Sequence, residues 1–221
     1  MPVQEGEYCG FETNIEDPGF LVVTFNRPES LNASTAAMKR DLVELLTQTQ
    51  MDDTIRIVVF TGRGQAFWAG DDLKGYGGDS VQVPQIHHGH HNPSGTYNGL
   101  RTISQAVNTA VRNLDKISIA AINGFAIQTG FSLALACDFR IASRSAKLGS
   151  ATLRFGLLPD EGGQWLLVQH LGVAKAMDFM MRKRIVDGET AFELGLVHEV
   201  VSDNNLMEET LTLARELADG P

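Results

Sequence analysis

The chain has 221 residues, of which 43% are apolar and 20% charged, so it can bury a hydrophobic core and is too apolar to remain disordered. It carries 18 basic and 27 acidic residues, a formal net charge of -9, which argues against nucleic acid as the main partner because phosphate binding needs a basic face. The sequence shows no membrane-length apolar run, no disulfide framework and no secretory signal, so we expect a reduced, cytoplasmic location.

Strand and helix patterns alternate along the chain. The β-branched runs 20–25 and 55–60 predict strands, and the apolar stripe between them predicts a helix from an N-cap at Ser34 to about Gln50. A second helix is predicted over about 98–113. The remaining predicted elements are strands over 117–123 and 138–142, and helices over about 163–171, 175–182, 189–194 and 205–218. This alternation without a break in composition predicts a single α/β domain.

The segment from Gly75 to Gly95 has no apolar periodicity, and we predict a long loop there. It contains the histidine cluster from His87 to His91. Histidines can bind a metal, but no carboxylate or cysteine lies beside these, and we expect no physiological metal. A histidine of this loop that supplements acid–base chemistry is a hypothesis.

Two glycine-bearing turns are candidates for chemistry. In residues 60–73 a strand ends in a glycine-rich turn, and Gly70 allows a backbone geometry that aims the next N–H into a cavity. In residues 121–138 a buried strand leads to Thr129 and Gly130 at the start of an apolar helix, where free N–H groups can stabilise an oxyanion. The alternatives are an ordinary β-turn in the first segment and, in the second, a glycine needed only for tight helix–strand packing.

Taken together, these segments resemble the crotonase superfamily, the enoyl-CoA hydratase/isomerase family. The matching motifs are NRPESLNA (26–33), FWAGDDLK (67–74), AINGFAIQTGFSLALACDFRIAS (121–143), KLGSATLRFGLLPDEGGQWLL (147–167) and LGLVHEV (194–200). They follow the family's order from about Phe20 onward, and such an ordered set is far more specific than any one motif.

The resemblance implies a crotonase-like α/β spiral of ββα units in a single domain over 1–221, with its core at about 11–200 and a C-terminal helix at about 203–219. It also implies assembly into homotrimers or hexamers. Relatives usually continue into further C-terminal helices, so we expect this helical region to be shortened here or to continue beyond residue 221.

The implied ligand is an acyl-CoA thioester, with coenzyme A as part of the substrate and no separate cofactor. The resemblance assigns the oxyanion hole to the backbone N–H groups of Asp71 and Thr129, although the family often has glycine at position 129. It assigns substrate contacts to Arg27, Ala33, Ala69, Gly70, Asp72, Leu73 and Lys74. For Arg27 and Lys74 the alternative is a solvated surface role, and for Asp72 it is a bond that only ties down the loop.

The positions of the two glutamates that activate water in family hydratases are occupied by Ser132 and Thr152. Neither residue can act as a carboxylate base, so hydration is disfavoured. By the resemblance, isomerase-type members carry a catalytic aspartate at the position that Asp160 occupies here. Some carry a glutamate in the same turn, which corresponds to Glu161. One carboxylate suffices for a double-bond shift, and burial should raise its pKa. The alternative is that Asp160 only caps the helix through Trp165.

The leading hypothesis is therefore an enoyl-CoA isomerase that forms a thioester enolate and uses Asp160. The alternatives are a hydratase-like lyase with relocated acids, a dehalogenase-like enzyme with an aspartate nucleophile, and a non-catalytic acyl-CoA-binding homologue.

Overall fold

Eleven strands in two sheets form the frame of the computed structural model, which describes residues 3–72 and 92–220. The strands are β1 (Gly6–Tyr8), β2 (Phe11–Glu16), β3 (Phe20–Phe25), β4 (Ile57–Gly62), β5 (Ala66–Trp68), β6 (Ile117–Ile122), β7 (Phe125–Ile127), β8 (Phe139–Ser143), β9 (Lys147–Gly149), β10 (Ile185–Asp187) and β11 (Glu199–Val201). The larger sheet has the order β1-β2-β3-β4-β6-β8-β11, and the smaller sheet has the order β10-β9-β7-β5. From β3 to β11 the larger sheet is parallel, which requires crossover connections between its strands.

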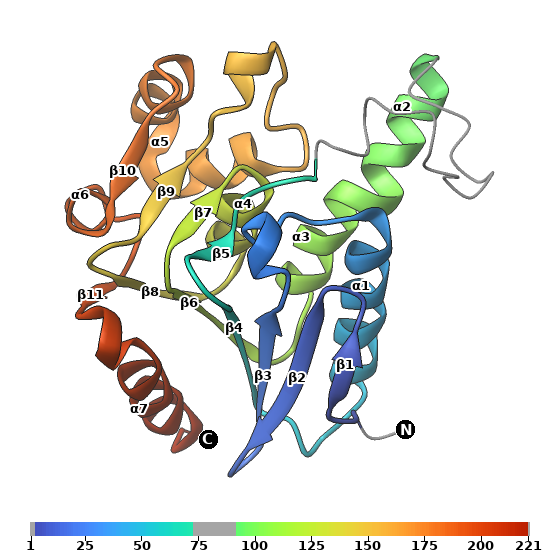
Figure 1. Cartoon of the computed structure of the whole chain (residues 1–221), viewed down its shortest axis with the longest axis vertical. Coiled ribbons are helices and arrows are strands. Elements are labelled where there is room, and N and C mark those ends of the chain that lie inside the picture. Colours follow the sequence, from blue (N-terminus) through green and yellow to red (C-terminus); the bar gives the residue numbers. More distant parts are fainter. Residues whose placement is uncertain (1–2, 73–91, 221) are drawn as a thin grey trace.

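Helices make these crossovers and cover the sheets (Figure 1). They are α1 (Ala36–Gln50), α2 (Pro93–Gly99), the π-helical segment η3 (Leu100–Ser104), α3 (Gln105–Arg112), α4 (Thr129–Ala136), α5 (Gly163–Met181), α6 (Gly188–Glu193) and α7 (Leu206–Ala218). Single 3-10 turns are η1 (Pro28–Ser30), η4 (Thr152–Phe155) and η5 (Asp203–Asn205). The α/β class agrees with the expectation from the sequence.

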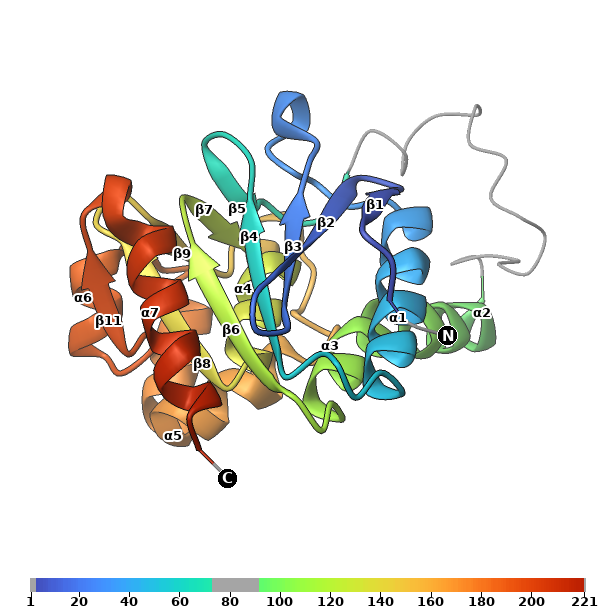
Figure 2. The ribbon, with the colours of Figure 1, turned by 90° about the horizontal axis from the view of Figure 1, so that it is seen from below.

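The larger sheet is buried on both faces. On one face, apolar side chains of the parallel strands, such as Val59 and Ile119, pack against Leu206 and Ala214 of α7, which crosses this face in Figure 2. On the other face, the main core joins the sheet to α1, α3, α4 and α5. Burial on both faces explains the nearly continuous apolar run of β6.

Several predicted boundaries need correction. Helix α1 is capped by Thr35, whose Oγ1 accepts a hydrogen bond from Met38 N at 3.2 Å, and not by Ser34. Residues 93–95, assigned to the loop from the sequence, open α2, because the side chain of Asn92 caps Gly95 N and Pro93 fits the first helical turn. The two helices predicted over 163–182 are confirmed, since Gly172 interrupts α5 with φ 71° and ψ 165°.

The smaller sheet and the N-terminal hairpin of β1 and β2 were not predicted. The strands of the smaller sheet are three residues long, too short for an alternating pattern to emerge. No helix in the described part of the chain is both long and apolar enough to cross a membrane.

Candidate active site

The candidate site lies where β5 and β7 of the smaller sheet end. These strands are parallel neighbours, so the loops that follow them leave from the same edge of the sheet. The first loop carries Asp71 and the second carries Thr129, and the two side chains meet: Thr129 Oγ1 donates to Asp71 Oδ1 at 3.0 Å. The structure thus brings together the two residues that the family resemblance assigned to an oxyanion hole.

The backbone around Asp71 aims its N–H away from a neighbouring segment. Asp71 forms an isolated parallel bridge with Ser34, in which Ser34 N donates to Gly70 O at 2.9 Å and Asp72 N donates to Ser34 O at 3.0 Å. In a parallel ladder the residue between two such bonds directs its own N–H to the opposite side. Gly70 enables this turn with φ 101°, a value that side-chained residues rarely adopt.

Thr129 is the first residue of α4, so its N–H has no partner within the helix. Helix α4 is buried along its whole length, which places its positive N-terminal end in a shielded environment. The preceding residue, Gln128, has φ 51° and ψ -111°, a strained conformation for a side-chained residue. Its backbone is held on both sides, because Gln128 N donates to Gly149 O and Gln128 O accepts from Ser132 N.

One carboxylate oxygen of Asp71 collects three donors. Besides Thr129 Oγ1, Oδ1 accepts from Ser34 Oγ at 3.0 Å and lies 2.8 Å from Lys39 Nζ. The Lys39 side chain is only 4% exposed and that of Asp71 14%, so this ion pair is largely withdrawn from water. The pair carries no net charge.

Glu161 is the buried carboxyl group of the site, with 3% of its surface exposed. Ser132 Oγ, on the first turn of α4, donates to Glu161 Oε1 at 2.6 Å. Burial raises the pKa of Glu161 to about 7 against the opposing effect of that hydrogen bond, and the charges of Asp160 and Asp71 raise it further. Glu161 Oε2 has no hydrogen-bond partner among the described residues.

The neighbouring carboxylate, Asp160, lies on the exposed side of the same turn. Helix α3 holds the turn from behind, because Gln105 Nε2 donates to Asp160 O and Asn108 Nδ2 donates to Glu161 O, both at 2.9 Å. The N-cap of α5 is Gly162, so the alternative in which Asp160 caps this helix does not hold.

The two residues that the family resemblance aligns with the hydratase glutamates carry buried hydroxyl groups in this structure. Ser132 and Thr152 are each 2% exposed, and Thr152 Oγ1 lies 3.2 Å from Ser150 Oγ. Glu161 therefore places a carboxyl group beside Ser132, where the resemblance expects a glutamate.

The predicted substrate contacts surround the first loop. Arg27 is engaged within the protein: its guanidinium donates to Ala33 O, and its Nη2 lies 3.0 Å from Asp72 Oδ2. This ion pair connects Arg27, at the start of η1, to the loop that carries Asp71. It favours the alternative in which Asp72 ties down the loop. Ala69 is partly exposed and Gly70 is buried. Leu73 and Lys74 lie outside the described residues.

The histidine cluster from His87 to His91 also lies outside the described residues. Within residues 3–72 and 92–220, no three histidine, cysteine or acidic side chains come together as a metal site. The other two histidines have structural partners. His170 Nε2 lies 3.0 Å from Leu135 O, and His198 Nδ1 accepts a hydrogen bond from Arg140 N at 3.1 Å.

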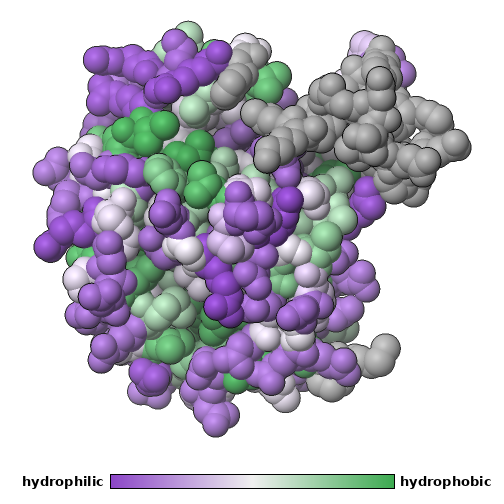
Figure 3. All heavy atoms as spheres, in the orientation of Figure 1, coloured by the Kyte–Doolittle hydropathy of each residue, from purple (hydrophilic) through white to green (hydrophobic). Residues whose placement is uncertain are grey.

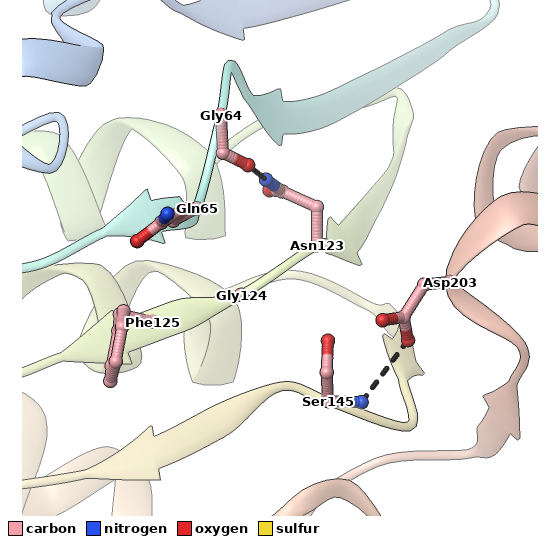
Figure 4. Close-up of a pocket in the computed structure, with 7 residues that line it drawn as sticks. All are labelled: Gly64, Gln65, Asn123, Gly124, Phe125, Ser145 and Asp203. Carbon is pink, nitrogen blue, oxygen red and sulfur yellow. Dashed lines mark hydrogen bonds between the residues drawn. The ribbon is translucent and has the colours of Figure 1, made fainter.

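A surface pocket lies at the opposite end of the smaller sheet, where β5 and β7 begin (Figure 4). Its polar groups bond mainly to each other: Asn123 Nδ2 donates to Gly64 O at 3.1 Å, and Ser145 N donates to Asp203 Oδ1 at 3.1 Å. These bonds connect the turn between β4 and β5 to Asn123, and the turn after β8 to Asp203.

Sequence reasoning missed Lys39, Ser34 and Asn108 as residues of the site. Lys39 adjoins the apolar stripe of α1, and a lysine next to that stripe was the available signal. Ser34 and Asn108 carried no signal, because their partners are 37 and 53 positions away in sequence.

Comparisons with known proteins place this fold in a known family. The sequence profile described as enoyl-CoA hydratase/isomerase matches residues 16–221. The 1,2-epoxyphenylacetyl-CoA isomerase of Escherichia coli is 38% identical over 209 residues, covering 93% of this chain and 75% of that protein. The hydroxycinnamoyl-CoA hydratase-lyase of Pseudomonas fluorescens is 31% identical, with coverage of 99% and 76%. The crystal structure of an enoyl-CoA hydratase from Bacillus anthracis superposes with a TM-score of 0.86 at 30% identity, covering 96% of this chain and 78% of that chain.

The fold is that of the crotonase superfamily, a class of acyl-CoA enzymes. Within it, the chain belongs to the enoyl-CoA hydratase/isomerase family, whose members matched here are named both isomerases and hydratases.

Proposed function

We propose that the protein is an enoyl-CoA isomerase in which Glu161, rather than Asp160, carries the proton. The observation that supports this most is the position of Glu161, a buried carboxyl group beside Ser132 at the start of α4. Asp160 is exposed on the same turn, which favours its neighbour for a reaction that must exclude water.

The proposed reaction needs one proton carrier and one oxyanion hole. The Glu161 carboxylate removes a proton from C2 of a 3-enoyl-CoA, and the electron pair moves into the thioester carbonyl to form a dienolate. The N–H groups of Asp71 and Thr129 hold the resulting oxyanion. Protonated Glu161 then returns the proton to C4, and the double bond ends between C2 and C3.

The pKa of Glu161 suits this double role. A value of about 7 keeps both forms populated near neutral pH, so the carboxylate can accept a proton and the protonated acid can return it. An acid with its ordinary pKa of 4.5 would be a weaker base in the first step.

A second candidate is a hydratase-like lyase in which Glu161 activates a water molecule. It is favoured by the position of Glu161 beside Ser132 and by Glu161 Oε2, which accepts no hydrogen bond from the described residues. Solvent oxygen entering a 2-enoyl-CoA would identify this reaction, whereas isomerisation incorporates none.

The deciding experiment compares Glu161→Gln with Asp160→Asn on a panel of 3-enoyl-CoA substrates. Glu161→Gln keeps the size and the bond to Ser132 but cannot take a proton, so we expect kcat to fall about 100-fold or more. Asp160→Asn should retain most of the activity. Formation of the conjugated 2-enoyl thioester is followed by absorbance, and deuterium exchange at C2 reports the enolate directly.

The reverse result, loss of activity in Asp160→Asn and its retention in Glu161→Gln, would transfer the proton-carrying role to Asp160. If neither substitution changed C2 exchange, the isomerase proposal would be wrong. A wild-type protein that binds acyl-CoA without any exchange would be the non-catalytic homologue.

A further inference from the structure

We propose that the side chains of Asp71 and Thr129 set the spacing of the two oxyanion donors, and that the buried ammonium group of Lys39 neutralises the Asp71 carboxylate at this position. These side chains are positioning residues, distinct from the backbone N–H groups that contact the substrate. The inference rests on the proposed function, because it assumes that the two N–H groups hold the thioester oxygen.

A hydrogen bond between side chains links the two donor loops directly. Asp71 and Thr129 are 58 positions apart in sequence, and each supplies one backbone donor. Their side chains are joined by the Thr129 Oγ1–Asp71 Oδ1 hydrogen bond of 3.0 Å. Any movement of one loop relative to the other must stretch this bond, so it restrains the distance between the two N–H groups.

The start of α4 at Thr129 needs external support, and Asp71 supplies it. The residue before Thr129, Gln128, has an unfavourable backbone conformation at φ 51°, so the start of α4 is not at its local energy minimum. Asp71 is itself held in place, because its Oδ1 binds Lys39 Nζ of α1 and Ser34 Oγ of the segment before α1. Asp71 therefore connects the second donor to the more firmly supported first loop.

Lys39 compensates the negative charge of Asp71 beside the proposed oxyanion hole. A carboxylate next to an oxyanion hole would oppose the negative charge that develops on the thioester oxygen. Lys39 Nζ lies 2.8 Å from Asp71 Oδ1 with its side chain 4% exposed, so the compensating charge is close and weakly screened by water. Lys39 Nζ also donates to Ser104 Oγ at 3.4 Å, which anchors the ammonium group to the π-helical segment η3.

The test uses a probe that reports carbonyl polarisation without turnover, para-dimethylaminocinnamoyl-CoA. Hydrogen bonds to its thioester oxygen move its absorption band to longer wavelength. Thr129→Val removes the hydroxyl and keeps the backbone N–H and the branched shape, so we expect a smaller band shift, and about a tenfold lower kcat with little change in KM. Thr129→Ser restores the hydroxyl and should recover both values.

Thr49→Val is the matched control, because Thr49 is a fully buried threonine of α1 whose hydroxyl donates to Leu45 O at 2.8 Å. It loses an equivalent buried hydrogen bond and should leave the band shift and kcat unchanged. Thermal unfolding of each variant separates a general loss of stability from a loss of polarisation.

Charge compensation is tested by Lys39→Met and by the double variant Lys39→Met/Asp71→Asn. The single variant leaves an uncompensated carboxylate and should lower both the band shift and kcat. In the double variant, the side-chain oxygen of Asn can still accept from Thr129 and Ser34 without a charge, so both values should rise again. The double variant also remains informative if Lys39→Met alone does not fold.

A wild-type band shift and kcat in Thr129→Val would overturn the positioning role, as would a wild-type protein that binds the probe without any shift. A double variant no better than folded Lys39→Met would overturn the charge compensation. If the wild type shifts the band and Thr129→Val reduces the shift, but no substrate is isomerised, the positioning role holds and the isomerase proposal alone fails.

Discussion

At the residue scale, the raised pKa of Glu161, which suits the proposed proton transfer, also makes the stability of the protein depend on pH. This pKa is about 7 in the folded protein and ordinarily 4.5, so the unfolded chain releases this proton at lower pH than the folded protein does. Between these two values, the contribution of Glu161 to the free energy of unfolding decreases as pH rises. The full difference corresponds to roughly 3 kcal/mol, which is the order of the cost of burying the charge.

Glu161→Gln removes this dependence, since glutamine does not titrate. We expect the variant to gain stability relative to the wild type as pH rises from 5 to 8, with most of the gain below about pH 7. Urea unfolding of both proteins at several pH values measures this difference. A constant difference in the free energy of unfolding across this range would contradict the raised pKa of Glu161.

At the element scale, the position of α4 against β5 depends on the absence of a side chain at Gly130. A Cβ atom at this position would lie 1.9 Å from the carbonyl oxygen of Trp68, which belongs to the backbone of β5 and cannot move aside alone. Gly130 is therefore needed for tight packing of α4 against β5, as the alternative from the sequence predicted. This packing role coexists with the proposed donor role of Thr129, because close approach of α4 to β5 is what brings the two donor loops together.

We expect Gly130→Ala to reduce the free energy of unfolding by about 3 kcal/mol or more. Gly6→Ala is the matched control, since a Cβ at Gly6 would meet nothing within 4 Å, and it should be nearly neutral. Urea unfolding measures both variants. A Gly130→Ala protein as stable as the control would show that α4 can move away from β5 at little cost.

At the scale of the whole molecule, the surface combines hydrophilic cover with exposed apolar groups. On the face in Figure 3, purple residues predominate, and green residues gather over the smaller sheet, to which the exposed Phe125 and Ile185 belong. A further group lies on the second half of α5: Val173, Met177 and Met181 are 67%, 50% and 58% exposed. Their spacing of four residues places them on one face of the helix.

We propose that this face of α5 contacts another copy of the chain in the homotrimer or hexamer implied by the family resemblance. Light scattering should then give a mass that is three or six times 24.1 kDa. Met177→Lys should shift the distribution toward smaller species, while Met51→Lys, at an apolar residue 77% exposed at the end of α1, should not. A monomeric wild type at micromolar concentration, or a Met177→Lys variant of unchanged mass, would contradict the proposed contact.

The sequence by itself determined the fold class and the longer elements, because long helices repeat their apolar residues with a clear period and buried strands form short apolar runs. It also indicated the family, through five motifs in the family's order. It also located the turns that carry Asp71 and Thr129, since those motifs are local. The short strands of the smaller sheet left no such pattern, and their pairing depends on contacts between distant segments.

Only the tertiary structure decided which groups of these turns meet. The sequence favoured Asp160 over Glu161, yet one is exposed and the other is buried against Ser132. Two adjacent residues in a turn point to different sides, and their order in the sequence does not say which side is the interior. The ion pair between Lys39 and Asp71 could not be predicted from the sequence either. Burial determines the pKa of a carboxyl group and the strength of an ion pair, and it depends on residues that are neighbours only in space.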